Sequence, residues 1–211
     1  MSELIELPMF PLGSVLLPGG VLPLHIFEVR YQQLLNHALE TDRRFGVVLI
    51  TRGSEVGGGE VRTDIGTIAH IDEYQRFDDG RAAVVSHGTG RFEVVEWLTD
   101  DPYPRALVRE LEIEPEGRND HDLLRTARGR FDALIELGQR LGRLESGHDI
   151  AWLPDLDDAT WQLAGQSPCS ALDHYTILSA PTRAERLEHI DRLLSEVYTD
   201  LELMGGLDSS S

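Results

Sequence analysis

The sequence predicts an α+β protein in which a β-rich N-terminal part, residues 1–115, precedes a helical C-terminal part, residues 118–204. Short apolar runs between Gly-rich and Pro-rich turns fill the first part, which favours a small, irregular β-barrel with one early helix. Apolar residues recur at helical spacing through the second part, which favours a bundle of about four helices. The tripeptide PEG at residues 115–117 separates the two, and residues 205–211 are expected to form a disordered tail.

The first strands lie in a segment, residues 7–31, that is strongly apolar yet contains four prolines and three glycines. Proline is tolerated in a strand at edges, ends and bulges, so one long central strand is excluded. We expect three short extended pieces, LPMFPL, SVLLP and VLPLHIF, with a turn at Pro18-Gly19-Gly20 between the last two. The third piece leads into a helix over residues 28–40, where apolar residues share one face.

Four further strands are predicted by apolar runs or by alternation, over residues 45–51, 66–74, 81–98 and 103–114. The sequence DDG at residues 78–80 supplies a hairpin turn, because glycine accepts the positive φ of tight turns. Gly88 and Gly90 indicate a bulge or a sharp bend. The glycine-rich segment at residues 54–61 is expected to be a mobile loop.

The helical part is predicted to contain helices over residues 120–144, 157–166, about 168–178 and 182–204. The third helix could begin at Ser167, which precedes a proline, or at Ser170, which could form a capping box with Asp173.

The final helix opens with a capping box of Thr182 and Glu185, and Gly205-Gly206 is expected to end it. Its apolar face could pack internally or against a second copy, so a homodimer stays open.

Composition excludes several classes of protein. The formal net charge of −18 repels nucleic-acid backbones, so we expect no nucleic-acid partner. All 19 basic residues are arginine, which excludes a P-loop lysine, a Schiff base and a Ser–Lys dyad. The N-terminus lacks a signal-peptide pattern and no window is long and apolar enough for a membrane helix, so we expect a cytoplasmic protein without a membrane partner.

Cys169 is the single cysteine, so an internal disulfide and a cysteine-rich zinc site are excluded. Its place at a predicted helix start could lower the pKa of its thiol, or the thiol could be buried and inert.

The sequence indicates no metal site, no cofactor and no catalytic residue. The eight histidines are scattered, and none forms an H-x-x-x-H pair. No G-x-S-x-G elbow or G-x-G-x-x-G loop occurs, so the glycine-rich segments are expected to be turns. Ser86 and His87 are a conceivable fragment of a dispersed Ser–His–Asp site, and a hydrolase of that kind is the alternative function.

The N-terminal segment LPMFPLGSVLLPGGVLPLHIFEVRYQQLL resembles the opening of the Lon protease N-terminal domain family, with its LP-x-FPL start, LFPG-like turn and LPLxIFExRY. The matching residues are Pro8, Phe10, Pro11, Leu12, Pro18, Gly19, Leu22, Pro23, Leu24, Ile26, Phe27, Glu28, Arg30 and Tyr31. Met9 and Leu17 depart from the usual Leu and Phe. The segments FGVVLI, GTIAHI, DGRAAVVSHGTGRFEV and PYPRALV follow in family order, and SALDHYTILSAPTRAERLEHIDRLL resembles the closing helices.

This resemblance implies a PUA-like β-barrel followed by a helical subdomain. In full-length Lon proteases this region is associated with capturing unfolded or tagged proteins, and ATPase and peptidase regions follow it. This sequence has no G-x-x-x-x-G-K-[ST] and no lysine, so it resembles a stand-alone, ATP-independent substrate-binding part. The implied partner is an unfolded or specific client polypeptide, with a separate protease as a further candidate. RNA binding, by analogy with other PUA-like barrels, is a third hypothesis.

The candidate binding surface is a groove beside the proline-laced strands. Peptide-binding modules need exposed apolar surface or an unpaired strand edge, and these strands offer edges. Arginine-bearing loops at residues 52–62 and 76–81 are expected to form its rims. Within them we single out Arg52, Arg76, Phe77 and Arg81, each of which could instead be an ordinary solvated loop residue.

Glu28, Arg30 and Tyr31 stand at the start of the early helix and have two interpretations. They could form a recognition surface. Alternatively they serve the architecture: Glu28 complements the helix dipole, Tyr31 packs inward and Arg30 pairs with a carboxylate.

Overall fold

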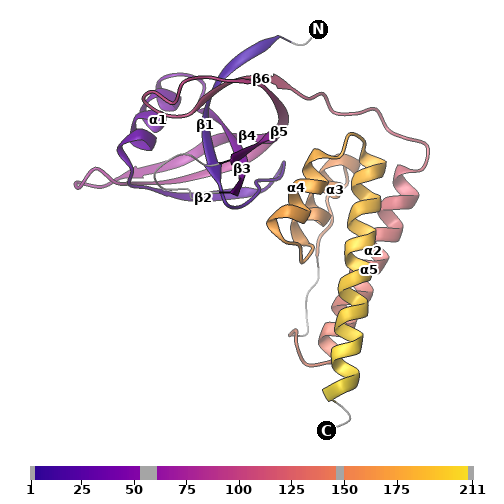
Figure 1. Ribbon diagram of the computed structural model, residues 1–211. Helices are drawn as coiled ribbons and strands as arrows, with labels where there is room; N and C mark the ends of the chain where they lie inside the picture. The colour runs from indigo at the N-terminus through magenta and orange to yellow at the C-terminus, as the bar shows by residue number, and fades with distance from the viewer. Residues whose placement is uncertain (1–2, 53–60, 146–149, 209–211) are drawn as a thin grey trace. The chain divides into compact units, whose positions relative to one another are not determined.

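The computed structural model describes residues 3–52, 61–145 and 150–208 and confirms an α+β protein. The chain divides into two compact units, Met1–Glu112 and Ile113–Ser211. Within the described residues the first unit contains six strands and one helix, and the second contains four helices (Figure 1). None of the helices in these ranges is both long and apolar enough to cross a bilayer. The predicted glycine-rich loop at residues 54–61 lies almost entirely outside the described residues.

The first unit is built on one mixed sheet with the strand order β2-β5-β4-β3-β1-β6. Its strands are β1 (Leu4–Leu12), β2 (Val21–Ile26), β3 (Arg44–Arg52), β4 (Val61–Arg76), β5 (Ala82–Trp97) and β6 (Arg105–Glu110). β1 and β3 are parallel and the other neighbours are antiparallel. The sheet is not a clean barrel: β6 pairs with both β1 and the end of β5, which closes β5, β4, β3, β1 and β6 into a ring, while β2 extends the sheet from the first half of β5.

Strand β1 shows how a proline-bearing segment can lie inside this sheet. Its first half, with Pro8, pairs with β6, and its second half, with Pro11, pairs with β3. Each half therefore has one neighbouring strand in the ladder, so a proline nitrogen can face the side that carries no bond. The segment forms a single strand of nine residues, which the sequence did not predict.

The turn at Gly19 and Gly20 is hydrogen-bonded to Gly88 of β5, next to the point where the register between β4 and β5 shifts. The Gly19 N–H donates to the Gly88 carbonyl oxygen at 2.8 Å, and the Gly88 N–H donates to the Gly20 carbonyl oxygen at 2.9 Å. A Cβ at Gly88 would lie 2.4 Å from the Leu17 carbonyl oxygen, so the close approach requires glycine. The predicted extended piece SVLLP is not a strand, because residues 13–20 form this loop.

Helix α1 (Val29–Glu40) covers one apolar face of the sheet. It buries Tyr31, Leu34, Leu35 and Ala38, as its periodicity predicts. The Tyr31 ring stacks on Phe10 with centroids 4.1 Å apart. Residues of β1 that point the other way enter a second core cluster with members of β3, β4, β5 and β6.

Strand β6 is shorter than its sequence pattern predicts. Alternation continues to residue 114, yet the strand ends at Glu110 and Ile113 is 75% exposed. The last ladder pair joins Phe92 to Glu110, and one further bond follows it, from the Leu111 N–H to the Arg91 carbonyl oxygen of β5 at 2.9 Å. The buried side chains of β6 are Ala106 and Val108.

The second unit contains α2 (Asp120–Arg140), α3 (Leu156–Gln166), α4 (Ala171–Ser179) and α5 (Arg183–Asp208). Helices α2 and α5 lie side by side (Figure 1), and Arg130 of α2 donates from Nε to Asp191 of α5 at 2.6 Å. Helix α5 continues to Asp208, so the prediction that Gly205-Gly206 ends it is wrong.

Capping side chains begin α3, α4 and α5, and at α3 the Asp155 carboxylate accepts from the Asp157 and Asp158 N–H groups. Ser170, not Ser167, is the N-cap of α4, and it forms the predicted capping box with Asp173. At the start of α5 the Glu185 N–H donates to the Thr182 hydroxyl at 3.2 Å, as predicted.

Candidate functional site

The candidate site lies beside β2, at the end of the sheet. In the ranges that the structure describes, β2 pairs with β5 on one edge and with no strand on the other. Two adjoining pockets, of about 370 Å³ and 200 Å³, share His25, Ile26 and Phe27. We call these pockets together the β2 groove. It is lined by Phe10, Leu12, Pro23, Leu24, His25, Ile26, Phe27, Glu28, Tyr31, Phe77, Arg81 and Ala82.

Two exposed aromatic rings border the β2 groove. Phe27 follows β2 and is 58% exposed, and Phe77 follows β4 and is 41% exposed. The hairpin turn between β4 and β5 holds Phe77 in place, since its N–H donates to the Arg81 carbonyl oxygen at 2.9 Å and Gly80 adopts φ +87°. Large exposed apolar side chains beside a pocket are typical of a binding surface.

The predicted site residues separate into two groups. Phe77 and Arg81 line the β2 groove. Arg76 instead donates to the Asn36 Oδ1 atom of α1 at 2.6 Å. Arg52 pairs with Val61 at the opposite end of β4, and neither arginine is among the residues that line the two pockets.

The family-motif residues Glu28, Arg30 and Tyr31 contact one another at the start of α1. The Arg30 Nε donates to the Glu28 carboxylate at 3.1 Å, and the Arg30 guanidinium lies 4.5 Å from the centroid of the Tyr31 ring. Glu28 and Tyr31 also form part of the groove wall. Sequence reasoning missed His25 and Phe27 as groove residues, although an aromatic residue just after an amphipathic strand is a usable signal.

Ser86 and His87 do not form a catalytic pair. They are consecutive residues of β5, so their side chains point to opposite faces. The Ser86 side chain is fully buried, whereas His87 Nδ1 lies 2.8 Å from Asp72 Oδ1. The hydrogen bond from His87 lowers the pKa of Asp72, so this carboxyl group is ionised at neutral pH.

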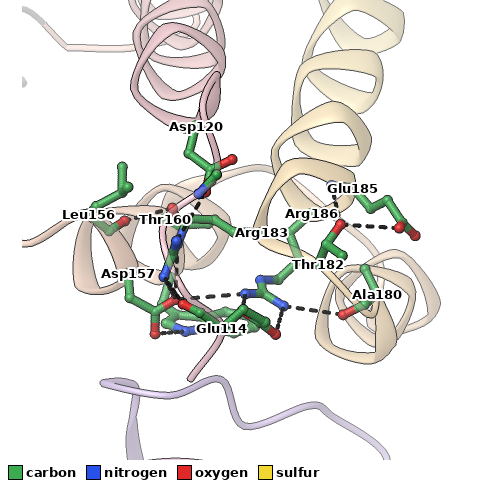
Figure 2. A network of polar contacts seen from close by, with 12 residues as sticks. Glu114, Asp120, Leu156, Asp157, Thr160, Ala180, Thr182, Arg183, Glu185 and Arg186 are labelled. Atoms are coloured by element: carbon green, nitrogen blue, oxygen red, sulfur yellow. Dashed lines mark hydrogen bonds and ion pairs between the residues drawn. The ribbon is translucent and has the colours of Figure 1, made fainter. Parts of the chain in front are cut away.

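A buried polar network in the second unit joins the first turns of three helices (Figure 2). Arg183 donates to Asp120 at 3.0 Å and to Asp157 at 3.3 Å, and Arg186 donates to Glu114 at 3.1 Å. Burial opposes the charge of Arg183, yet the bonds and charges of both aspartates outweigh it and raise its pKa. Every cation in this network faces a carboxylate, which is the arrangement of a structural network rather than of a binding site.

Cys169 is half-buried next to the start of α4. Burial and the Asp173 carboxylate raise the pKa of its thiol to about 11, so the helix start does not activate it. We expect Ellman's reagent to modify the folded chain at pH 8 at least about tenfold more slowly than the urea-unfolded chain. The rate for the folded chain should rise about tenfold per pH unit until the protein unfolds. Equal rates in the two states would contradict this expectation.

Comparisons with known proteins agree on one family. The sequence profile of the ATP-dependent protease La (LON) substrate-binding domain matches residues 6–196. Lon protease 2 of Herpetosiphon aurantiacus is 26% identical over 94% of this chain, and Lon protease 2 of Myxococcus xanthus is 34% identical over 54%. The aligned regions are 25% and 14% of those two proteins, so the chain spans about a quarter or less of their length.

Solved structures share the fold. The crystal structure of a Lon N-terminal domain protein from Xanthomonas campestris is 29% identical, with a TM-score of 0.63 over 88% of this chain and 96% of that one. The N-terminal domain of a Mycobacterium avium complex Lon protease matches with a TM-score of 0.66 at 16% identity, over 91% of this chain and 99% of that one. The mixed sheet, the helices and the profile match lead to one conclusion: the chain belongs to the Lon substrate-binding domain family.

Proposed function

We propose that this chain is a non-catalytic protein-binding module that holds apolar segments of client polypeptides in the β2 groove. The observation that carries the proposal is the juxtaposition of two exposed aromatic rings, Phe27 and Phe77, with pockets beside an edge of β2 that no strand of the described residues covers. Membership of a substrate-binding family supports recognition of protein substrates.

The chemistry of the groove favours side-chain recognition over strand addition. Pro23 lies in the middle of β2 and has no N–H to donate, so an added strand would find an incomplete ladder. Phe27 and Phe77 instead offer apolar area, while Glu28 and Arg81 place one charge of each sign on the lining. We therefore expect extended apolar segments to bind with modest sequence preference, as a receptor for unfolded chains requires.

A binding assay with fluorescein-labelled β-casein tests this function. Phe27→Ala and Phe77→Ala should each weaken binding by about tenfold, because truncating a central aromatic anchor typically costs more than 1 kcal/mol. Val95→Ala is the matched control, since Val95 is 44% exposed on the same sheet and lies outside the lining of both pockets. Affinities that are equal for all three variants would rule out the groove.

The two rival functions, hydrolysis and RNA binding, predict different results with the same purified protein. A hydrolase would cleave the casein, and a single Ser or His substitution would abolish the cleavage. An RNA-binding protein would be retained on a polyanion resin, which the net charge of −18 opposes. Binding to a separate protease, homodimerisation and a cytoplasmic location stay predictions from the sequence.

A further inference from the structure

Two histidines and one aspartate converge on the outer face of β4 and β5. His70 and His87 are direct partners in the antiparallel ladder, and their ring centroids are 5.5 Å apart. The register shifts between Ile71 and Glu73, which leaves Asp72 as an extra residue without a cross-strand partner. The bulge thus brings the Asp72 carboxylate against His87, at 2.8 and 2.9 Å from Nδ1.

His70 contributes a ring nitrogen that its surroundings leave unsatisfied. Its Nδ1 atom is buried and has no hydrogen-bond partner among the described residues. The same atom lies 3.5 Å from Asp72 Oδ1 and so points to the carboxylate that His87 already contacts. A buried polar atom without a partner costs free energy, and an ion coordinated by this nitrogen would remove that cost.

We propose that His70, Asp72 and His87 bind a divalent transition-metal ion of the Zn²⁺ type. One ligand atom from each residue lies within 4.8 Å of the others. Ligand atoms around one tetrahedral ion, with bonds of about 2.1 Å, are roughly 3.4 Å apart. Side-chain rotations that shorten these separations would bring all three into coordination, and the ion would give His70 Nδ1 a closer partner than Asp72 Oδ1 at 3.5 Å.

The ligand set determines which ions fit. Two imidazoles with one carboxylate suit Zn²⁺, Co²⁺ or Ni²⁺, whereas Ca²⁺ and Mg²⁺ prefer sites built of oxygen atoms. The three side chains are 38%, 39% and 42% exposed, so an ion can enter from solvent. Three protein ligands leave a coordination position for water or for a donor from another molecule. This site is separate from the β2 groove lining and does not depend on the proposed function.

Titration of the purified full chain with Co²⁺ tests the proposal. We expect one equivalent to bind and produce the visible d–d absorption of a four-coordinate ion, and Zn²⁺ to displace it. His70→Ala and His87→Ala should each weaken binding by more than about tenfold. His121→Ala is the control, because His121 pairs with Glu116 at 2.9 Å on the other unit and belongs to no such cluster among the described residues.

NMR of the unmodified protein gives a second readout, which does not require that any variant folds. Imidazole NMR signals of the unmodified protein should shift on Zn²⁺ addition for His70 and His87 and stay in place for His121. Co²⁺ binding that survives both substitutions, or Zn²⁺ shifts confined to other histidines, would overturn the proposal, as would the absence of binding.

Discussion

Replacing Arg186 by methionine is expected to lower the free energy of unfolding of the helical unit by about 3 kcal/mol. The Arg186 side chain is 1% exposed, lies 4.7 Å from the centroid of the Trp161 ring and donates to Glu114 and to the Ala180 carbonyl oxygen. Its removal takes one charged donor away from each of these acceptors. The Glu114 side chain is 21% exposed and can partly rehydrate, which keeps the loss at the lower end for a broken buried pair.

Urea unfolding followed by tryptophan fluorescence and far-UV circular dichroism measures this loss. Arg125→Met is the matched control, since Arg125 pairs with Asp122 on the same unit but both side chains are more than 70% exposed. Its midpoint should stay that of the unmodified protein. If the two variants unfold at the same urea concentration, the network in Figure 2 contributes no net stability.

Replacing Gly66 by alanine is expected to destabilise the sheet unit by about 3 kcal/mol through overpacking. An added Cβ would lie 2.3 Å from the Val47 carbonyl oxygen and 2.5 Å from Phe92 Cζ. Val47 is in the neighbouring strand and Phe92 is fully buried, so neither can move without disturbing the ladder. We expect the melting temperature of this unit to fall by roughly 10 °C or more.

Gly90→Ala is the control for this substitution. Gly90 lies in β5 of the same sheet, and nothing is within 4 Å of the Cβ that alanine would add. Its melting temperature should change little, because alanine also restricts the unfolded chain. If the Gly66→Ala and Gly90→Ala proteins have the same melting temperature, the strands around Gly66 can shift enough to accommodate the added Cβ.

Features that depend on neighbours along the chain were predicted well. Helix α1 and its buried Tyr31 follow from a 3.6-residue period, and the turn at Gly80 follows from its sequence. The capping box of Ser170 and Asp173 was one of two alternatives that the sequence left open. These elements depend on interactions between residues only a few positions apart, and a local sequence pattern reflects interactions over that range.

The candidate site was predicted in part. Phe77 was singled out because it follows a strand and precedes a turn, and it does line the β2 groove. Phe27 reaches the same groove because β2 pairs with β5 at Ile26 and Ala82, a contact between residues more than fifty positions apart. Arg52 was grouped with Phe77 although the long strand β4 separates them.

By itself, then, the sequence determined the α+β class, the capped start of the final helix, the tight turns and the family. The tertiary structure alone decided how β1 accommodates its prolines, how β6 closes onto β5 and which charges meet around Arg183 and Arg186. It also brought His87 to His70 and Asp72 through a bulge. The physical reason is range: propensity and capping act between near neighbours, whereas strand register and buried ion pairs depend on residues that folding brings together from distant positions.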